Sequence, residues 1–329
     1  MKLLTFWLFA FQAFFFHVSL MSQTCCSGGV PVSNSLGFSV EEKGILQISL
    51  SADLNILSSL YTGTQLLDDR QRQRTTQSFN FRASYTIDRK LAIETFIPII
   101  HQTRKITSVL GNVDLESSFG VGDPVVLMIY DVSQSALSWR VGFGPQIPLG
   151  RTNIKNDRGL LLVEDLQPGS GAWDAIFFSS VVFTPYRRPS RNAFLNIIYS
   201  LTGRNPDSRE GAQTYQFGND LQFIAGVGDQ FALSNQIFQA GVGARYRSAA
   251  RDEIDGFENS GTGGQFLFAR LNMGWILPKL KIHMTAEIPV FTQVNETQLA
   301  SSFLLNLALH KRISWSTNSS EPIEEPFKI

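Results

Sequence analysis

The stretch LQISLSADLNI, residues 46–56, alternates apolar and polar side chains over eleven positions. Successive side chains of a β-strand point to opposite faces, so the stretch predicts a strand with one apolar and one polar face. A strand of a soluble sandwich usually shows such alternation over only about five or six residues. The run is therefore longer than a soluble β-sandwich requires.

The same period of two recurs along the chain, with clear examples at residues 78–87, 137–144, 238–247, 267–275 and 280–290. No helical period of 3.6 residues competes with it. Segments 119–130 and 173–186 are apolar on both faces. We predict about twelve strands, at residues 45–58, 75–87, 90–105, 117–131, 136–148, 173–186, 191–204, 212–227, 230–247, 264–277, 279–292 and 299–315.

The predicted connections alternate between short and long. The short turns fall at Asp88-Arg89, Asp131–Ser135, Pro185–Ser190, Gly228-Asp229 and Pro278-Lys279. The other connections are mostly longer and polar, at residues 59–74, 106–116, 149–172, 205–211, 248–263 and 293–298. This alternation is typical of outer-membrane barrels, which have an even strand number, short periplasmic turns and long extracellular loops. The prediction is an all-β fold: a single transmembrane antiparallel β-barrel of about twelve strands.

A closed barrel also explains why so many half-apolar strands occur without amphipathic helices to cover them. In lipid, every backbone group must be paired within the protein, and a closed barrel pairs them without leaving an edge. Four aromatic residues near strand ends fit an interfacial girdle: Trp139, Tyr246, Trp275 and Trp315.

The overall composition excludes several function classes. Lys plus Arg equals Asp plus Glu at 28 each, so no net charge points to nucleic acid as a partner. Beyond the first twenty residues no apolar run reaches the roughly 18 residues that a spanning helix needs.

The N-terminal residues indicate secretion. Lys2 precedes the nearly continuous apolar run Leu3–Phe16, and the pattern predicts a signal peptide over residues 1–22 that is cleaved after Ser22. A single N-terminal anchor helix is the alternative. The expected location of the mature protein is the bacterial outer membrane.

The remaining domain organisation follows from the strand pattern. Residues 45–315 form the predicted barrel, and residues 316–329 form a polar C-terminal tail. Residues 23–44 contain Gly28, Gly29, Pro31 and Gly37, and they form either a plug within the barrel or a periplasmic segment.

Cys25 and Cys26 follow the predicted cleavage point directly. Adjacent cysteines do not form an easy disulfide with each other, and two thiols alone supply too few ligands for a metal site. The alternatives are a metal or redox role, pairing with another molecule, and no role at all. No cofactor is predicted.

The polar faces of the strands give a set of candidate lumen-lining residues with both signs of charge. They are Asp53, Arg82, Glu94, Arg140, Asp220, Arg245, Arg247, Arg270, Lys281, His283, Glu287, His310 and Arg312. The late strands are richest in cations, which favours an anionic or carboxylate solute. Alternatively these charges pair with one another and stabilise the barrel.

Three phrases resemble a known family: GVGDPVVLMIY (Gly120–Tyr130), VGFGPQIPLGR (Val141–Arg151) and LQPGSGAWDAIFFSSVVF (Leu166–Phe183). They resemble segments of the outer-membrane transporters grouped as "MetA-pathway of phenol degradation", which are broadly similar to fatty-acid channels. CCSGGVPVSNSLGF (Cys25–Phe38) is similar to mature N-termini of such proteins from Bacteroidetes-type bacteria. The resemblance implies a porin-like channel for passive uptake of small, hydrophobic or aromatic carboxylate-type solutes.

Two other function classes stay open. One is a structural or adhesive barrel that acts through its extracellular loops, above all residues 149–172. The other is a barrel-embedded lipid hydrolase with a Ser–His–Asn site, for which His101, His283 and His310 are the available histidines after residue 22. We expect no enzyme. The expected partners are outer-membrane lipid, a small-molecule solute, and the periplasmic chaperones and barrel-assembly machinery.

Overall fold

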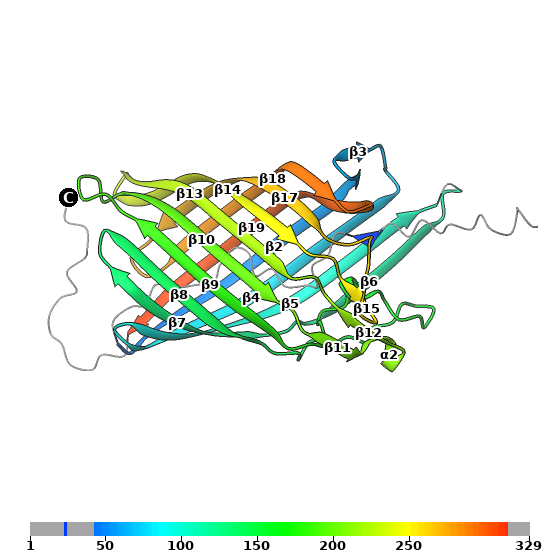
Figure 1. Ribbon diagram of the computed structural model, residues 1–329. Helices are drawn as coiled ribbons and strands as arrows, with labels where there is room; N and C mark the ends of the chain where they lie inside the picture. The colour runs from blue at the N-terminus through cyan, green and yellow to red at the C-terminus, as the bar shows by residue number, and fades with distance from the viewer. Residues whose placement is uncertain (1–22, 25–42, 109, 315–329) are drawn as a thin grey trace, which may run out of the picture.

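The computed structural model describes residues 23–24, 43–108 and 110–314. In this part of the chain, twelve antiparallel strands close into one barrel whose strands are tilted to its axis (Figure 1). The predicted fold class and strand number are thereby confirmed. In chain order the barrel strands are β2 (Ile45–Thr62), β4 (Arg72–Asp88), β5 (Leu91–Thr107), β7 (Val125–Gln134), β8 (Leu137–Gln146), β9 (Asp174–Phe183), β10 (Arg191–Leu201), β13 (Asp220–Leu233), β14 (Gln236–Ala249), β17 (Gly264–Ile276), β18 (Lys281–Val294) and β19 (Thr297–Ser314).

The last strand closes the barrel by pairing with the first. β19 and β2 are antiparallel neighbours from Thr297 opposite Thr62 to Ser314 opposite Ile45. The barrel therefore begins and ends at the same rim, as an even strand number requires. Short turns join the strands at this periplasmic rim, and the longer connections lie at the other (Figure 1).

One predicted turn is wrong. Gly228 and Asp229 lie inside β13, opposite Gly241 and Ala240 of β14, and the turn falls six residues later at Ser234-Asn235. Both turn residues have positive φ, 51° and 62°, as the favoured two-residue hairpin turn requires. The Gly-Asp pair had the composition of a turn, but its side chains belong to a longer strand.

One predicted strand is divided in two. The stretch 117–131 consists of β6 (Val113–Val121) and β7, which are separated at residues 122–124. β6 pairs only with the outer half of β5, whereas β7 continues the barrel wall. Pro124 has no N–H to give to a strand ladder, which is consistent with the break at this point.

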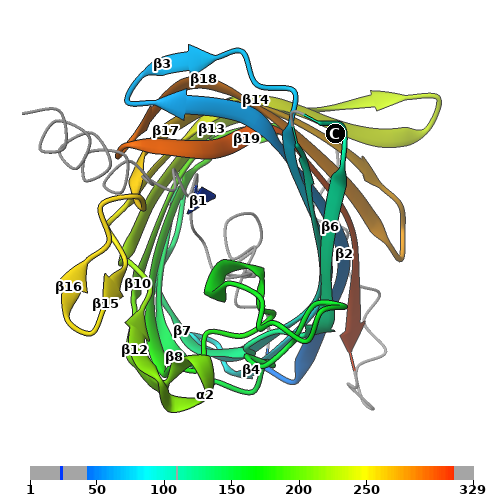
Figure 2. The same cartoon turned by 90° about the vertical axis from the view of Figure 1, so that its right-hand side faces the viewer.

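The extracellular end carries additional short elements. β11, β12, β15 and β16 form a small second sheet beside the rim, and Figure 2 shows it outside the ring of barrel strands. The short elements are β3 (Gln65–Leu67), the 3₁₀ helix η2 (Glu164–Leu166), β11 (Arg204–Asp207), α2 (Ser208–Gly211), β12 (Gln213–Gln216), β15 (Glu253–Ile254) and β16 (Phe257–Glu258).

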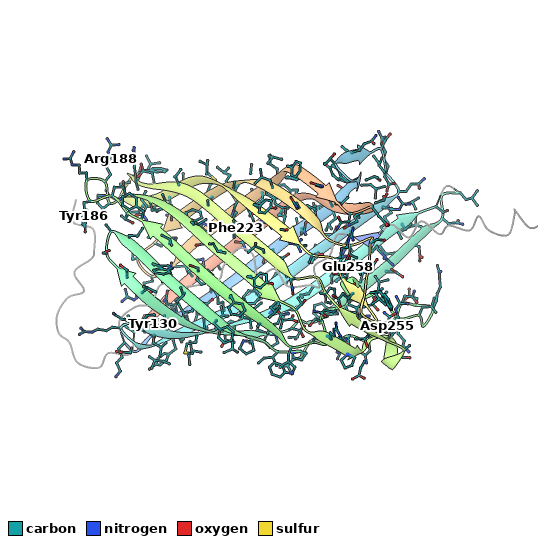
Figure 3. The ribbon with its side chains drawn as sticks, viewed as in Figure 1. Tyr130, Tyr186, Arg188, Phe223, Asp255 and Glu258 are labelled. Atoms are coloured by element: carbon teal, nitrogen blue, oxygen red, sulfur yellow. The ribbon has the colours of Figure 1, made fainter. Side chains whose placement is uncertain are left out.

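The outer surface of the barrel is apolar, as a lipid-facing surface must be. On β4 the side chains of Phe79, Phe81 and Tyr85 are exposed, whereas Asn80, Arg82 and Ser84, which point to the other face, are buried. Figure 3 shows Tyr130 and Phe223 on the outside of the wall. Of the predicted aromatic girdle, Trp139 is exposed on the outer face, whereas Trp315 lies outside the described residues.

The edge of β19 near the extracellular rim pairs with an N-terminal strand. β18 and β19 pair only as far as Glu287 opposite Leu304, although both continue towards the rim. β1 (Gln23–Thr24) runs parallel to β19 at Gln298 and Leu299, beyond the point where β18 departs (Figure 2). The predicted signal peptide, the rest of the predicted plug and the C-terminal tail lie outside the described residues and stay predictions.

Within the described ranges, no helix is long and apolar enough to cross a membrane.

Candidate functional site in the barrel lumen

One side of the lumen is lined by apolar side chains. The inward positions of β5 and β7 carry Phe96, Leu127 and Ile129, each at most 2% exposed. Those of β9, β10 and β13 continue the same surface. The whole cluster, which we call the apolar wall, comprises Ala92, Phe96, Val125, Leu127, Ile129, Ile176, Phe178, Ile198 and Ile224, with Phe194 packed against it.

A glycine lets the apolar wall pass over β8 without a break. A Cβ atom on Gly142 would lie 3.4 Å from both Ile129 of β7 and Phe178 of β9. Without a side chain at this position, residues from strands on either side of β8 approach each other. The apolar wall is thus one surface that extends over six strands, with side chains from five of them, rather than several isolated patches.

The opposite side of the lumen, formed by β14, β17, β18, β19, β2 and β4, is polar, and several of its charged residues form ion pairs. Glu287 of β18 accepts hydrogen bonds from Arg245 Nε at 2.8 Å and Arg245 Nη2 at 2.6 Å. Its other oxygen lies 2.9 Å from Arg270 Nε. All three side chains are at most 5% exposed, so the two guanidinium groups and the carboxylate form one buried cluster.

Two more ion pairs join neighbouring strands inside the barrel. Arg82 Nη1 of β4 lies 3.6 Å from Glu94 Oε1 of β5. Arg247 Nε of β14 donates to Asp220 Oδ2 of β13 at 2.5 Å. The interpretation in which the lumen charges pair with one another therefore describes seven of the thirteen candidate residues.

Asp53 is held by amides rather than by a cation. Its carboxylate accepts hydrogen bonds from Asn80 of β4 and from Asn306 of β19, the latter at 2.6 Å. These contacts tie the first barrel strand to the neighbour on each side. Asp53 thus lies at the closure of the barrel.

The remaining candidates occupy three different settings. Arg140 contacts Ser180 on the neighbouring strand at 3.4 Å. Lys281 and His310 lie opposite each other on β18 and β19. Arg312 is exposed close to the periplasmic end of β19. Contact of these residues with a solute stays a prediction.

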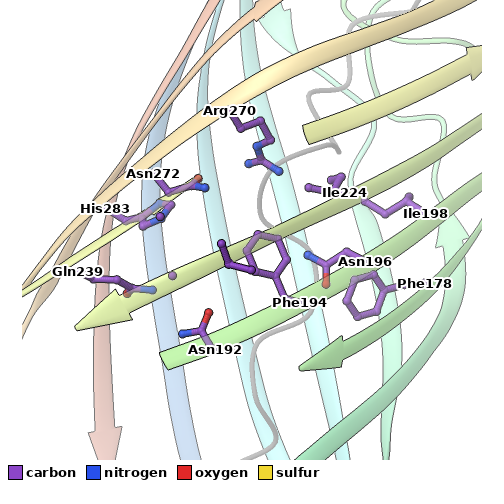
Figure 4. A pocket seen from close by; sticks show the side chains of 13 residues that line it. Phe178, Asn192, Phe194, Asn196, Ile198, Ile224, Gln239, Arg270, Asn272 and His283 are labelled. Atoms are coloured by element: carbon purple, nitrogen blue, oxygen red, sulfur yellow. The ribbon is translucent and has the colours of Figure 1, made fainter. Parts of the chain in front are cut away.

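A cavity of about 180 Å³ lies where the apolar wall meets the polar side of the lumen (Figure 4). Phe178, Phe194, Ile198 and Ile224 form its apolar part. The polar part consists of Asn192, Asn196, Gln239, Arg270, Asn272 and His283, and of these the sequence analysis had singled out Arg270 and His283. The cavity therefore offers both an apolar surface and polar groups to one small molecule.

The connection between β8 and β9, residues 147–173, turns inward at the extracellular end, and we call it the strap. Figure 2 shows this green segment projecting across the bore. Within it Leu162 and Leu166 are at most 2% exposed. The sequence predicts a polar outer loop here, but the centre of the connection packs against the interior.

The strap is fastened to the inner wall by Asp165. Arg74 Nη1 of β4 donates to Asp165 Oδ2 at 2.6 Å, and Arg74 also donates to the Asp165 carbonyl oxygen. Gln102 of β5 donates to the same carbonyl oxygen at 3.3 Å and accepts a hydrogen bond from Arg74. Both partners of the strap are inward-facing residues of the barrel.

The neighbouring residue Glu164 fastens the strap to the loop after β10. Its Oε1 atom accepts hydrogen bonds from Ser208 Oγ at 3.1 Å, Arg209 Nε at 3.0 Å and Gln213 Nε2 at 2.9 Å. The adjacent carboxylates of η2 thus hold the strap at two separate parts of the rim.

The two ends of the strap converge on one buried carboxylate. Asp123, in the break between β6 and β7, accepts hydrogen bonds from Gly150 N at 2.8 Å, Ser170 N at 2.6 Å and Ser170 Oγ at 2.8 Å. Gly150 and Gly169 touch so closely that a Cβ on either would lie 2.5 Å from the backbone of the other. The three phrases that resemble the phenol-degradation family meet at this junction.

Sequence reasoning missed the apolar wall and the inward strap, although both left a signal. Segments 119–130 and 173–186 are apolar on both faces because their inward side forms the wall. In the strap, the run Leu160–Val163 is apolar inside an otherwise polar connection.

No described group of three or more His, Cys, Asp or Glu residues could hold a metal ion. Cys25 and Cys26 lie outside the described residues.

The comparisons with known proteins agree with this geometry. The family model described as "Putative MetA-pathway of phenol degradation" matches residues 62–307. No curated protein matches the chain. Among solved structures, the COG4313 outer membrane channel from Pseudomonas putida F1 has a TM-score of 0.67 at 13% identity, covering 85% of this chain and 99% of that one.

Two further barrels are similar at a lower level. The TodX deltaS2S3 mutant monoaromatic hydrocarbon channel has a TM-score of 0.43 at 7% identity, with 84% of this chain and 91% of that one covered. A Pseudomonas aeruginosa FadL homologue has a TM-score of 0.40 at 10% identity, with coverages of 81% and 90%. Because the family model spans well over half of the sequence, the chain belongs to the family described as "Putative MetA-pathway of phenol degradation", and its fold is that of an outer-membrane β-barrel.

Proposed function

We propose that the protein is a passive outer-membrane channel for small solutes that combine an apolar body with a polar group. The main observation in support of this proposal is that the lumen has an apolar wall and a polar side, with a cavity where they meet. A barrel stabilised by its interior alone has no need of a continuous apolar surface facing a polar one.

The apolar wall supplies the attraction for the body of the solute. Apolar area removed from water contributes roughly 25 cal/mol per Å², so the ring of a solute gains free energy where it leaves water for this wall. The wall extends from Phe96 to Ile224, and the side chains of its buried cluster are at most 4% exposed. A solute therefore meets the wall at the cavity, where Phe178, Phe194, Ile198 and Ile224 line open space.

Several charged groups on the polar side of the lumen already have partners of opposite sign. Glu287 forms ion pairs with both Arg245 and Arg270, and Asp220 forms an ion pair with Arg247. This arrangement supports passage of solutes whose polar part is small. The strap narrows the extracellular mouth because Asp165 and Glu164 hold it to separate parts of the rim.

The COG4313 protein from Pseudomonas putida F1 is named only as an outer membrane channel, and TodX is named as a monoaromatic hydrocarbon channel. These names agree with the proposal, whereas the support for it comes from the lumen itself. Lipid on the outside and a small solute on the inside are the proposed partners, with periplasmic chaperones and the barrel-assembly machinery expected during folding.

The test is electrical. Purified full-length protein is inserted into planar bilayers, and the ion current is recorded while small aromatic solutes or sugars of similar size are added. We expect a small steady current that aromatic solutes reduce reversibly and sugars do not. Absence of any current, or equal reduction by both classes of solute, would count against the proposal.

The two other function classes make different predictions. An adhesive barrel would bind cells through its loops and carry no solute-dependent current. A lipid hydrolase would release fatty acids from vesicles and lose this activity on His101→Ala. In the structure His101 faces outward, where a lipid hydrolase would have its site, but the contacts of its ring are Gln77 Oε1, 3.5 Å from Nδ1, and the ring of Phe119. Neither is the hydroxyl that a Ser–His–Asn site needs, which supports a channel over a hydrolase.

A further inference from the structure

We propose that the cavity is a binding site for a neutral single-ring molecule that carries one hydroxyl group, and that Gln239 and Asn272 select the hydroxyl. The inference rests on the proposed channel function and assigns a preferred solute class to one place in the lumen. It departs from the carboxylate that the cation-rich late strands had favoured.

Two glycines lie at the edge of the cavity. Gly228 of β13 and Gly241 of β14 are opposite each other, and both line it. A Cβ on Gly228 would lie 3.3 Å from Asn192 Oδ1 and 3.7 Å from Gln239 Nε2, so the missing side chain makes room for these two amides. The volume of the cavity, about 180 Å³, is slightly larger than the roughly 150 Å³ apolar cavity known to accept benzene. A single ring with one small substituent fits this volume.

The apolar part of the cavity suits a ring. Phe178 and Phe194 come from adjacent strands, and Ile198 and Ile224 lie beside them (Figure 4). Aromatic pairs in offset or edge-to-face contact contribute about 0.5–1.5 kcal/mol beyond the area they bury. A flat ring placed here has aromatic neighbours on one side and the amides on the other.

The polar part contains one unmatched donor and one unmatched acceptor. Within the described residues, Asn272 Nδ2 and Gln239 Oε1 are buried and have no hydrogen-bond partner. Thr285 Oγ1 donates to Asn272 Oδ1 at 2.9 Å, which turns the Nδ2 group of Asn272 away from β18. Asn272 is only 9% exposed, so its unmatched donor is not turned to the outside of the molecule.

The strand register places each of the two amides opposite a glycine on the β14–β17 ladder, whereas on its other side Gln239 is opposite Gln230 of β13. Gln239 is directly opposite Gly274, and Asn272 is directly opposite Gly241. Each amide therefore faces a glycine across the ladder, and glycine offers no side chain to bind. The two amides are diagonal neighbours, which lie about 7–8 Å apart across adjacent strands.

A hydroxyl group is the chemical match for such a pair. It donates one hydrogen bond and accepts others, whereas an ionised carboxylate only accepts and an ammonium only donates. A hydroxyl can thus donate to Gln239 and accept from Asn272 at once. A plain hydrocarbon would leave both amide atoms buried without a partner, which is costly.

The nearest cation does not reverse this preference. Arg270 lines the cavity, but its guanidinium Nε lies 2.9 Å from Glu287. A carboxylate solute would have to compete with that buried ion pair and would also lose its own hydration. The neutral hydroxyl avoids both costs.

The test is a binding measurement with four fluorinated probes of equal ring size. The full-length barrel is placed in lipid nanodiscs, and ¹⁹F NMR follows 4-fluorophenol, 4-fluorobenzyl alcohol, 4-fluorobenzoate and fluorobenzene. Wild type is compared with Gln239→Leu and Asn272→Leu. Gln222→Leu is the matched control, because Gln222 faces the lumen on β13 but does not line the cavity.

We expect wild type to bind the two hydroxyl probes most tightly. Each amide substitution should weaken their binding roughly tenfold, the upper range for one neutral hydrogen bond, and should leave fluorobenzene unchanged or bound more tightly. Gln222→Leu should bind all probes as wild type does. Asn196→Phe, which fills the cavity from β10, should abolish the binding of every probe even if the amide variants do not fold.

Tighter binding of 4-fluorobenzoate, or equal binding of hydroxyl probes by wild type and both amide variants, would overturn the assignment. If aromatic solutes still block the wild-type current in that case, the proposed channel stands and only the site fails. If wild type neither conducts nor binds any probe, the channel and the site fail together.

Discussion

Arg74 on the inner wall of β4 and Asp165 in the strap form a buried ion pair, with Nη1 and Oδ2 2.6 Å apart and the two residues 91 positions apart in sequence. The side chains are 3% and 12% exposed. The pair fixes the centre of a long extracellular connection to the interior of the barrel. It thus sets how far the mouth of the lumen is covered.

Loss of the Arg74–Asp165 pair should open the mouth. In Arg74→Gln, the Asp165 carboxylate loses its cation, and breaking a buried pair in this way costs about 3–5 kcal/mol. We expect the strap to leave the wall and the single-channel conductance in planar bilayers to rise several-fold. The barrel strands do not depend on this contact, so the protein should still fold.

The control for this prediction is Arg191→Gln. Arg191 pairs with Asp229 at the periplasmic end, where both side chains are about half exposed, and its loss should leave the conductance unchanged. A conductance of Arg74→Gln equal to that of wild type would show that the strap does not limit the current.

Asp123 should be important for stability at the junction of the strap. In Asp123→Ala, the N–H groups of Gly150 and Ser170 and the hydroxyl of Ser170 lose their acceptor. Each unpaired buried donor costs about 1–3 kcal/mol. We expect Asp123→Ala to have a clearly lower midpoint of urea unfolding in lipid vesicles than wild type. Asp123→Asn keeps one acceptor oxygen, so its midpoint should decrease less.

If Asp123→Ala and Asp123→Asn lower the midpoint of urea unfolding equally, the number of hydrogen bonds that Asp123 accepts does not determine its contribution to stability.

Glu287 should be the most costly single lumen charge to remove. Glu287→Gln leaves Arg245 and Arg270 side by side without their shared carboxylate. Uncompensated buried charge costs about 3–5 kcal/mol, so we expect a large decrease in the free energy of unfolding, measured by urea titration. Glu258→Gln removes a carboxylate from an exposed pair with Arg251 and should leave the unfolding midpoint close to that of wild type.

If Glu287→Gln and Glu258→Gln shift the unfolding midpoint equally, the lumen cluster does not stabilise the barrel.

The barrel itself could be predicted from the sequence because the contrast between lipid and lumen determines the side-chain pattern of each strand separately. Each strand faces lipid on one side and the lumen on the other, and the alternation of apolar and polar side chains in residues 46–56 reflects this. The strand order then follows from antiparallel neighbours joined by turns. Two local features could not be predicted. Gly228-Asp229 and Ser234-Asn235 have equally turn-like compositions, and the break of the predicted strand 117–131 at residues 122–124 left the apolar run uninterrupted on either side.

The two sides of the lumen could not be predicted in the same way. The side chain of Phe178 points inward, but alternation cannot distinguish an inward apolar residue from an interruption of the pattern. The pairing of Arg74 with Asp165 depends on where a connection of 27 residues, 147–173, folds in space. Likewise, Gln239 and Asn272 have no special spacing in sequence, and only the strand register places each of them opposite a glycine.

The most direct test of the channel account is the initial rate at which cells take up radiolabelled benzyl alcohol. The compared cells make wild type, Ile129→Asn, Ser84→Asn or no barrel, with equal amounts of folded protein verified by heat-dependent gel migration. Ile129→Asn interrupts the apolar wall, whereas Ser84→Asn adds the same amide to the polar side. We expect the initial uptake rate to exceed that of barrel-free cells for wild type and Ser84→Asn. For Ile129→Asn we expect an uptake rate close to that of barrel-free cells. Equal uptake by cells with and without the barrel, or by wild type and Ile129→Asn, would contradict it.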